Sequence, residues 1–409
     1  MARRTFLTAD GAIAKKQPIK KQSEAQTDSL AKADGPFLIL VLVLVVFGLL
    51  MLYSASYVAG IYRFNDSFHF FSSQLLFAVL GVVAMYVVSY VDYRLLRNFA
   101  WPAMVATWGL LVIVLFMEPI NNAKRWIYLG TVGTFQPSEV AKFAVILLFS
   151  HLIALNYKSM ESKNLKTSFT FGVTPFVIVL IPVVLLLLLE PHLSATVIIC
   201  LMAVVMMFVG GTALKWFVAG GILAMACLST AFVFLKELVP YVTVRLQTWQ
   251  DPFSDASVAG HQTIQSLLAV GSGGWRGLGL GNSRQKHLYV PEPQNDFIFS
   301  IICEELGFIG AVLVIVLFVA LLVRGTGIAM RARDRFGTMM VTGIMAQVML
   351  QATLNIAVVT NTIPNTGISL PFFSYGGTSL LMLLGEMGIV LSVSRRSLQF
   401  DKETEEAEE

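Results

Sequence analysis

Residues 288–310 read LYVPEPQNDFIFSIICEELGFIG, which places an acid at the entrance of an apolar helix. Pro291 and Pro293 each fix φ and disfavour helix in the residue before them. Regular helix is therefore expected to begin only at about Asn295 or Asp296. On this reading Asp296 is a carboxylate in the first helical turn.

The helix that follows has the length and composition of a membrane span. Residues 297–323 are almost wholly apolar, which is long enough to cross a bilayer with some tilt. Over all 409 residues, 56% are hydrophobic and only 13% are charged, too few polar side chains to cover a soluble globule. Apolar segments recur near residues 37–58, 69–91, 100–118, 138–155, 170–189, 193–210, 212–237, 297–323, 337–361 and 375–394. We predict an all-α polytopic membrane protein with about ten transmembrane helices and a long extracytoplasmic loop, 238–295, between the seventh and the eighth.

The distribution of Lys and Arg sets the orientation of these spans. Connections on one side of the predicted membrane carry 20 of them and those on the other side carry 8. Because cytoplasmic loops are enriched in positive charge, both termini are expected in the cytoplasm, and the long loop and Asp296 are expected outside. We predict a disordered cytoplasmic tail over residues 1–35, a ten-helix membrane domain over 36–396 and an acidic cytoplasmic tail over 397–409.

Two classes of ligand are not expected from the composition. The net charge of +4 is explained by the cytoplasmic loops, and no basic stripe interleaved with aromatic residues indicates nucleic acid. Cys200, Cys227 and Cys303 lie in apolar segments at no ligand spacing and are interpreted as free thiols in the core. His192 has no second ligand at a zinc spacing, so no protein-bound metal site is predicted.

Charged side chains gather between residues 121 and 142. Glu139 and Lys142 are three residues apart, so they are neighbours on one helix face and can neutralise each other. Inside a membrane such a pair either locks helices together or binds an ionic ligand, and both interpretations stay open. Lys124 and Arg125 lie on the outer side, against the overall charge bias. They are candidates for holding phosphate, with interfacial snorkelling as the alternative.

The long loop carries a Gly-rich run at residues 271–281. A nucleotide site is rejected, because the run has neither the strand-glycine-helix frame nor the lysine of a Walker motif. A pliable loop that lines a groove is expected instead. Contact with pyrophosphate by Arg276, Arg284 or Lys286, which lie in this run or just after it, stays open as a further interpretation.

Two further outer connections are polar. Glu190 and His192 lie in a very short turn, which fits either a capped turn or a proton relay. Residues 361–379 are dense in Pro and Gly, which predicts non-helical backbone. Such backbone is tolerated at membrane depth only where it is buried in protein or lines a polar cavity, so this stretch is expected to form a wall of the cavity that holds Asp296.

In their order and spacing, these motifs resemble the SEDS family (shape, elongation, division and sporulation), and its FtsW branch in particular. The resemblance covers nearly all of residues 37–396. It is carried by Lys124-Arg125-Trp126-Ile127, Gln136-Pro137-Ser138-Glu139 with Lys142, the run from Gly271 to Lys286, Pro291-Glu292 with Asp296-Phe-Ile-Phe, Glu304-Glu305-Leu-Gly307, and Thr366-Gly367 through Leu370-Pro371 to Ser374-Tyr375-Gly-Gly.

The resemblance implies a ten-helix peptidoglycan glycosyltransferase of the bacterial inner membrane that polymerises lipid II into β-1,4-linked glycan strands for septal cell-wall synthesis in cell division. It implies a class B penicillin-binding protein, the septal transpeptidase, and other divisome membrane proteins as partners. The family's proposed catalytic aspartate falls on Asp296. The cytoplasmic N-terminal extension and Ser369, where elongation-type members tend to carry Pro, favour the septal branch.

Some positions depart from the family pattern. The Gln-Pro-Asp-Leu-Gly turn of the family reads Glu190-Pro-His192-Leu-Ser194 here. His261 stands where Tyr is usual, and Gln294-Asn295 replace the common His-Thr before the acid. A role for that preceding His in the family could not operate in this chain.

The chemistry implied by the resemblance needs one carboxylate. Lipid II carries an α-linked diphosphate, so a β-linked product requires inversion by direct attack of the acceptor hydroxyl, with Asp296 as general base. Lys, Arg or a divalent cation, Mg or Mn, would help the diphosphate leave. The substrate is a membrane lipid. We expect it to be bound by Lys124, Arg125, Gln136, Glu139, Lys142, Arg245, Arg284, Lys286 and Ser374.

Other functions remain as alternatives. A hydrolase needs a second acid near Asp296, yet on an unbroken helix Glu304 lies about 12 Å along the axis and Glu305 on the opposite face. A flippase for the lipid-linked precursor would use Glu139, Lys142, Glu190 and Glu386 as a polar path through the membrane. A non-catalytic division scaffold predicts that Asp296 is expendable.

Overall fold

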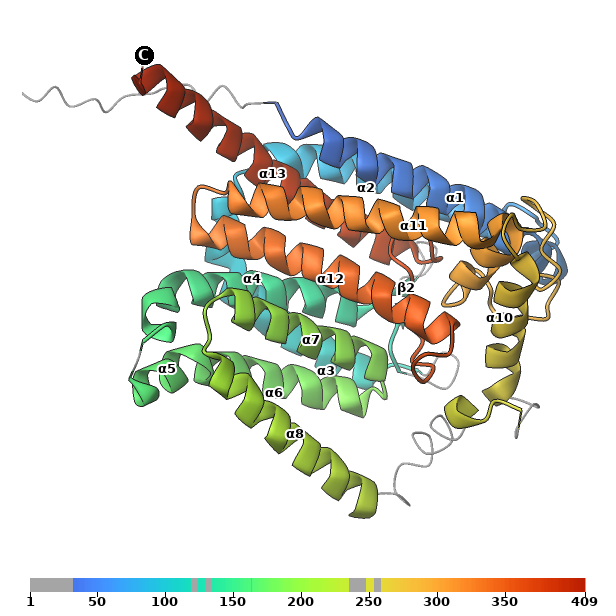
Figure 1. Ribbon diagram of the computed structural model, residues 1–409, viewed down its shortest axis with the longest axis horizontal. Helices are drawn as coiled ribbons and strands as arrows, with labels where there is room; N and C mark the ends of the chain where they lie inside the picture. Colours follow the sequence, from blue (N-terminus) through green and yellow to red (C-terminus); the bar gives the residue numbers. More distant parts are fainter. Residues whose placement is uncertain are drawn as a thin grey trace, which may run out of the picture. The chain divides into compact units, whose positions relative to one another are not determined.

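The computed structural model describes residues 32–118, 124–128, 134–162, 164–234, 248–253 and 259–408, and residues Ala31–Glu409 form one compact unit. The predicted all-α architecture is confirmed, apart from one two-stranded hairpin (Figure 1). The elements are α1 (Gly35–Phe64), α2 (His69–Tyr90), the 3-10 helix η1 (Tyr93–Phe99), α3 (Ala100–Leu115), β1 (Ile127–Tyr128), β2 (Thr134–Phe135), α4 (Pro137–Met160), α5 (Leu165–Gly172), α6 (Thr174–Leu189), α7 (Leu193–Val209), α8 (Leu214–Phe234), α10 (Ala259–Gly273), α11 (Ile298–Met330), α12 (Arg335–Val359) and α13 (Gly377–Glu408).

The expected number of spans agrees with the helices observed. Within the described residues, eight helical segments have the length and hydropathy to cross a membrane, with η1 joined to α3 and α5 joined to α6. Two shorter apolar helices, Leu193–Val209 and Leu214–Ala226, bring the number of candidate spans to ten. The protein is a multi-pass membrane protein.

Burial is distributed as expected for a bundle surrounded by lipid. Large apolar side chains such as Ile39, Ile178 and Ile222 are more than half exposed. The most enclosed spans are α4 and α13, each with 67% of its most apolar window buried. Polar side chains on these helices, among them Lys142 and Glu386, are buried. The polar side chains of these spans therefore point into the bundle, among buried apolar side chains, while the outer surface of the bundle is apolar.

The long outer loop is more ordered than the sequence suggested. It contains a regular helix, α10, which packs against α11 at the end of the bundle opposite the C-terminus of α13 (Figure 1). The Gly-rich run after α10 docks on α11: Leu278 N donates to Glu304 O (2.9 Å) and Phe308 N donates to Gly274 O (2.8 Å). Residues 238–247 and 254–258 of the predicted loop lie outside the described residues.

A close backbone approach explains the glycines of this run. Gly277 has φ +74°, and a Cβ there would overlap the backbone of Glu305. Gly307, on the other side of the contact, has φ +67° and interrupts α11, and a Cβ there would overlap Gly277. The expectation of a pliable groove lining is thus wrong for this run, because its backbone is fixed against α11.

The start of α11 also differs from the expectation. Helical hydrogen bonding begins at Ile298, and Phe297 is the N-cap residue. Asp296 therefore lies in the turn before the helix and not in its first turn. Pro293 and the turn over residues 293–297 delay the helix by about two residues, and this places the carboxylate beside the chain that follows α12.

Candidate active site

A polar cavity of about 460 Å³ opens among α2, α4, α7, α12 and the non-helical segments near Asp296 and Ser374. Asp296 lines it, and so do the basic side chains of Arg125 and Lys142. Gln136, Glu139 and Ser374 complete the set of predicted substrate-binding residues that the structure brings to this space. An acid and two cations that are far apart in sequence thus share one cavity.

Asp296 is half-buried and is held in place through its backbone. Asn355, fully buried on α12, donates from Nδ2 to Asp296 O (2.7 Å) and to Ile368 O (2.6 Å). This amide joins the turn before α11 to the segment after α12. Gly367, at φ +72°, lies so close that a Cβ there would be 3.1 Å from Asp296 Oδ2. The position of the carboxylate is therefore set by Asn355 and by the absence of a side chain at residue 367.

The segment after α12 forms a wall of the cavity, as predicted from its Pro and Gly content. Ser374 Oγ donates to Asn295 O (2.7 Å) and accepts from Leu370 N (2.7 Å). Gln74 of α2, which is buried, accepts from Gly376 N at Oε1 (3.0 Å) and donates from Nε2 to Ser374 O (3.3 Å). These side chains satisfy backbone groups that a helix would otherwise have paired.

Glu139 and Lys142 form the ion pair that their spacing predicted. Lys142 Nζ lies 2.8 Å from Glu139 Oε1, and the Lys142 side chain is only 2% exposed. Ser379 of α13 donates to Glu139 Oε2 (3.1 Å), so the pair also links α4 to α13. Because both residues line the cavity as well, the structure is compatible with helix locking and with ligand binding.

Arg125 and Gln136 flank the β1–β2 hairpin and both reach the turn between α6 and α7. Arg125 donates through a terminal guanidinium nitrogen to Pro191 O. Gln136 Nε2 lies 3.3 Å from His192 Nε2. Burial, with the nearby charges of Arg125 and Lys142, lowers the pKa of His192 to about 3. The imidazole is thus neutral, and the positive charge of this part of the cavity comes from Arg125 and Lys142.

Among the other predicted binding residues, Lys124 and Arg284 are described and do not line the cavity. Lys124 is exposed and donates to Leu115 O (3.0 Å). Arg284 is exposed too, and its backbone N donates to Glu304 Oε1 (3.0 Å). Arg245 lies outside the described residues. For these three residues a role in binding substrate stays a prediction.

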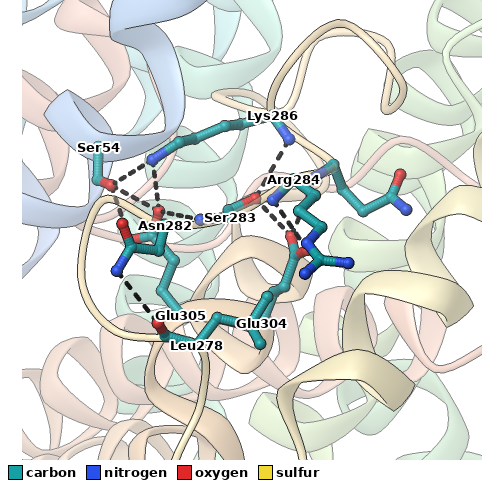
Figure 2. A network of polar contacts seen from close by, with 9 residues as sticks. Ser54, Leu278, Asn282, Ser283, Arg284, Lys286, Glu304 and Glu305 are labelled. Carbon is teal, nitrogen blue, oxygen red and sulfur yellow. Dashed lines mark hydrogen bonds and ion pairs between the residues drawn. The ribbon is translucent and has the colours of Figure 1, made fainter.

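Lys286 occupies a different environment from the one expected. Its Nζ lies 2.7 Å from Glu305 Oε1 and donates to Ser54 Oγ (3.3 Å), and both charged side chains are fully buried (Figure 2). The ammonium also lies over the ring of Tyr57, 4.8 Å from its centroid. Lys286 is held inside the protein by these partners and does not line the described cavity.

The neighbouring acid Glu304 completes this network. Its carboxylate accepts from Arg284 N (3.0 Å), Gln285 N (3.3 Å) and Ser283 Oγ (Figure 2). Glu305 accepts in addition from Ser54 Oγ (2.7 Å) and Ser283 N (3.3 Å). Glu304 is therefore engaged with the loop and Glu305 with the loop and α1, and neither lines the cavity as a second acid for Asp296.

Several residues of the site were not identified from the sequence. Gln347, Gln351 and Asn355 are buried and lie at four-residue spacing on one face of α12. Amides repeated at this spacing in an apolar helix were a usable signal for a polar cavity. Gln347 donates to the buried Glu386 of α13 (2.9 Å). No group of three or more His, Cys, Asp or Glu side chains suited to a metal ion occurs among the residues with described positions.

Comparison with known proteins assigns the chain to a family. Residues 36–399 match the family model described as a cell cycle protein, which covers FtsW, RodA and SpoVE. The chain belongs to this family, known as SEDS. A solved structure described as "Structural coordination of polymerization and crosslinking by a peptidoglycan synthase complex" aligns with a TM-score of 0.74 and 27% identity, covering 90% of this chain and 99% of that one.

Two relatives extend the comparison over almost their whole lengths. "Stage V sporulation protein E" of Bacillus subtilis is 42% identical over 372 residues, which cover 90% of this chain and 99% of that protein. "Probable peptidoglycan glycosyltransferase FtsW" of Geobacter sp. strain M18 is 38% identical, covering 89% and 97%. The rod-shape determining protein RodA of Thermus thermophilus aligns with a TM-score of 0.63 and 26% identity, covering 89% and 97%.

Proposed function

We propose that the protein is a peptidoglycan glycosyltransferase that polymerises lipid II on the outer side of the membrane. One observation carries the proposal: the cavity places the carboxylate of Asp296 in the same space as the cationic side chains of Arg125 and Lys142. A base for a sugar hydroxyl and cations for a diphosphate are the two requirements of the reaction. Family membership and the relative named as a glycosyltransferase support the assignment.

The reaction is an inverting displacement. Asp296 accepts the proton of the acceptor hydroxyl as its oxygen attacks the anomeric carbon of the donor. The new carbon–oxygen bond forms on the face opposite the breaking bond, and the lipid diphosphate leaves with the electron pair of that bond. Arg125 and Lys142 stabilise its charge in a partly dehydrated cavity, where such contacts are worth more than in water. The diphosphate needs no proton to leave, so a second acid is not required.

The buried acids support this one-base scheme over hydrolysis by two carboxylates. Glu304 and Glu305 are saturated by hydrogen bonds away from the cavity. Glu139 lines the cavity but is paired with Lys142. A divalent cation that enters with the diphosphate stays a prediction, and the described residues offer no cluster of ligands that fits a resident one.

The finer proposal is the FtsW branch, acting at the division septum with both termini in the cytoplasm. The asymmetric distribution of Lys and Arg supports the orientation. A class B penicillin-binding protein is the proposed partner, supported by a similar structure described as coordinating polymerization and crosslinking. The sporulation relative at 42% identity makes sporulation the competing cellular role.

The test is polymerisation of fluorescent lipid II in detergent by the purified protein with its transpeptidase partner. Asp296→Asn keeps the size of the side chain and should lower the rate by about 10²–10⁴-fold, the usual contribution of a general base. Asp66→Asn makes the same chemical change at an exposed acid beyond the end of α1 and should retain activity.

Glycan formation in this assay separates the polymerase from both alternatives. A flippase forms no glycan in detergent, because no compartments remain, and a scaffold forms none under any condition. Glycan chains formed by Asp296→Asn and by Asp296→Ala at the wild-type rate would remove Asp296 as the base while leaving the enzyme class intact.

A further inference from the structure

Glu190, at the end of α6, is a buried acid without a hydrogen-bonding partner. The residue is 1% exposed, and within the described part of the chain neither carboxylate oxygen receives a hydrogen bond. An ionised carboxylate in this state would lose its hydration without compensation. Burial accordingly raises the pKa of Glu190 to about 8, and only the charge of Arg125 opposes this shift. At neutral pH the group is therefore mainly a neutral carboxylic acid.

Arg125 lies between this acid and the cavity. It donates to Pro191 O, the carbonyl of the residue next to Glu190, and it also lines the cavity. Its Nε is buried and has no partner among the residues of known position. The guanidinium thus has unused hydrogen-bonding capacity, and two anions compete for it: a ligand in the cavity or the carboxylate of Glu190.

The other ionisable groups of this corner do not replace Glu190 in that role. His192, in the same turn, is neutral at neutral pH. Lys142, on α4, is paired with Glu139 at 2.8 Å. Arg125, from the segment before β1, is the charged group that acts on Glu190. The pair of Arg125 and Glu190 can therefore be considered by itself.

We propose that Glu190 is a positioning residue for Arg125: as a neutral acid it leaves the guanidinium to an anionic diphosphate in the cavity, and as a carboxylate it takes the guanidinium as its own ion-pair partner. The proposal rests on the proposed function, in which Arg125 contacts the diphosphate of the substrate. On this proposal, the turn between α6 and α7 controls how much positive charge the cavity offers to a ligand.

The sign of the pH dependence follows. Raising the pH through about 8 ionises Glu190, so Arg125 is withdrawn and diphosphate binds more weakly. Conversely, a bound diphosphate disfavours a second negative charge nearby, so binding raises the proton affinity of Glu190. Binding near pH 8 is therefore accompanied by proton uptake.

The experiment measures binding of farnesyl diphosphate, used as the probe, to the full-length protein in detergent by calorimetry. Between about pH 7 and pH 9 the wild-type affinity should fall by up to about tenfold, because the protonated fraction of a group with a pKa of about 8 falls by that factor over this range. Glu190→Gln keeps the shape and the neutral state and should bind at pH 9 as it does at pH 7. Glu386→Gln removes another buried carboxyl, one bonded to Gln347, and should keep the wild-type pH dependence.

The Arg125→Gln variant provides a second test of the proposal. It should bind weakly at both pH values, and adding Glu190→Gln should change nothing further. If Glu190→Gln does not fold, the test is the number of protons taken up when the diphosphate binds, compared between the wild type and Arg125→Gln. This number is obtained from calorimetry in two buffers of different ionisation enthalpy. Uptake by the wild type alone supports the proposal. Equal uptake by both, or an equal loss of affinity at high pH in the wild type and Glu190→Gln, overturns it.

The two proposals fail separately. Proton-linked binding of the diphosphate without glycan synthesis would reject the polymerase and keep the role of Glu190. Glycan synthesis with binding that does not depend on Glu190 would do the reverse.

Discussion

Lys286 with Glu305, and Arg125 with Glu190, are two pairs of a basic and an acidic side chain. The pairs differ in how their hydrogen-bonding groups are satisfied. Lys286 and Glu305 are 2.7 Å apart, and Ser54 and Ser283 N bond to the remaining positions (Figure 2). In the second pair, Arg125 Nε and both Glu190 oxygens have no hydrogen-bonding partner in the described structure.

The difference separates structural charge from charge that can bind a ligand. Buried polar groups are almost always paired, so the few that are not require a physical reason. Here the unpaired groups lie beside a cavity of about 460 Å³, and the paired ones lie where the loop meets α1 and α11. A fully satisfied network fixes geometry, whereas an unsatisfied one can exchange a proton or a partner.

The largest expected effect comes from breaking the satisfied pair. Lys286→Met leaves Glu305 buried without its counter-ion and should cost about 3–5 kcal/mol of stability. Thermal unfolding in detergent measures the loss. Lys286→Met combined with Glu305→Gln removes both charges and should recover part of it.

The same variants test the predicted role of Lys286 in binding substrate. A folded Lys286→Met protein with wild-type stability but weakened diphosphate binding would show that this lysine acts on the ligand. The distinction between a structural pair and a ligand-binding pair would then be wrong.

An intermediate effect is expected at the cavity. Lys142→Met should lower glycan synthesis by about tenfold to a hundredfold, because a charged hydrogen bond to the diphosphate is lost. The charge swap Glu139→Lys with Lys142→Glu keeps an ion pair on the same helix face. If the swapped protein folds and regains activity, the pair is structural; if it folds without activity, Lys142 is a ligand of the substrate. Lipid II polymerisation and thermal unfolding are measured together.

The smallest effect is expected at a surface pair. Arg63 and Glu292 form an ion pair, and their side chains are 45% and 39% exposed. Arg63→Gln should change stability by no more than about 1 kcal/mol, because water and salt screen exposed pairs. Thermal unfolding at low and high salt checks this value. A loss as large as that of Lys286→Met would mean that burial does not decide the ranking.

Features carried by local sequence were predicted well. The ten spans follow from apolar composition, and the Glu139–Lys142 pair follows from helical spacing. The cavity wall after α12 follows from the inability of its Pro and Gly residues to continue a helix. Each of these signals lies within a few residues of the feature that it predicts.

Features that depend on distant contacts were not predicted. Ser54 and Glu305 are separated by 251 residues, and nothing near either position indicates the other. The environment of Lys286 depends on that contact, so its charge suggested a ligand where the structure has a buried partner. The segment after α12 approaches Asp296 through Asn355, which lies 59 residues away in the chain.

The break at Gly307 affects how the protein responds to the bilayer. α11 has 33 residues, about 50 Å of helix, against a hydrocarbon core of about 30 Å. Its first part, before the break, is bonded to the loop through Glu304 and Glu305, and the longer part continues from Gly307 to Met330. Long spans tilt when membrane thickness changes. Because the Gly-rich run is also bonded to Phe308 N and Ile309 N, just beyond this glycine, we expect the contact to hold the turn that carries Asp296 in place while the remainder of α11 adjusts its tilt.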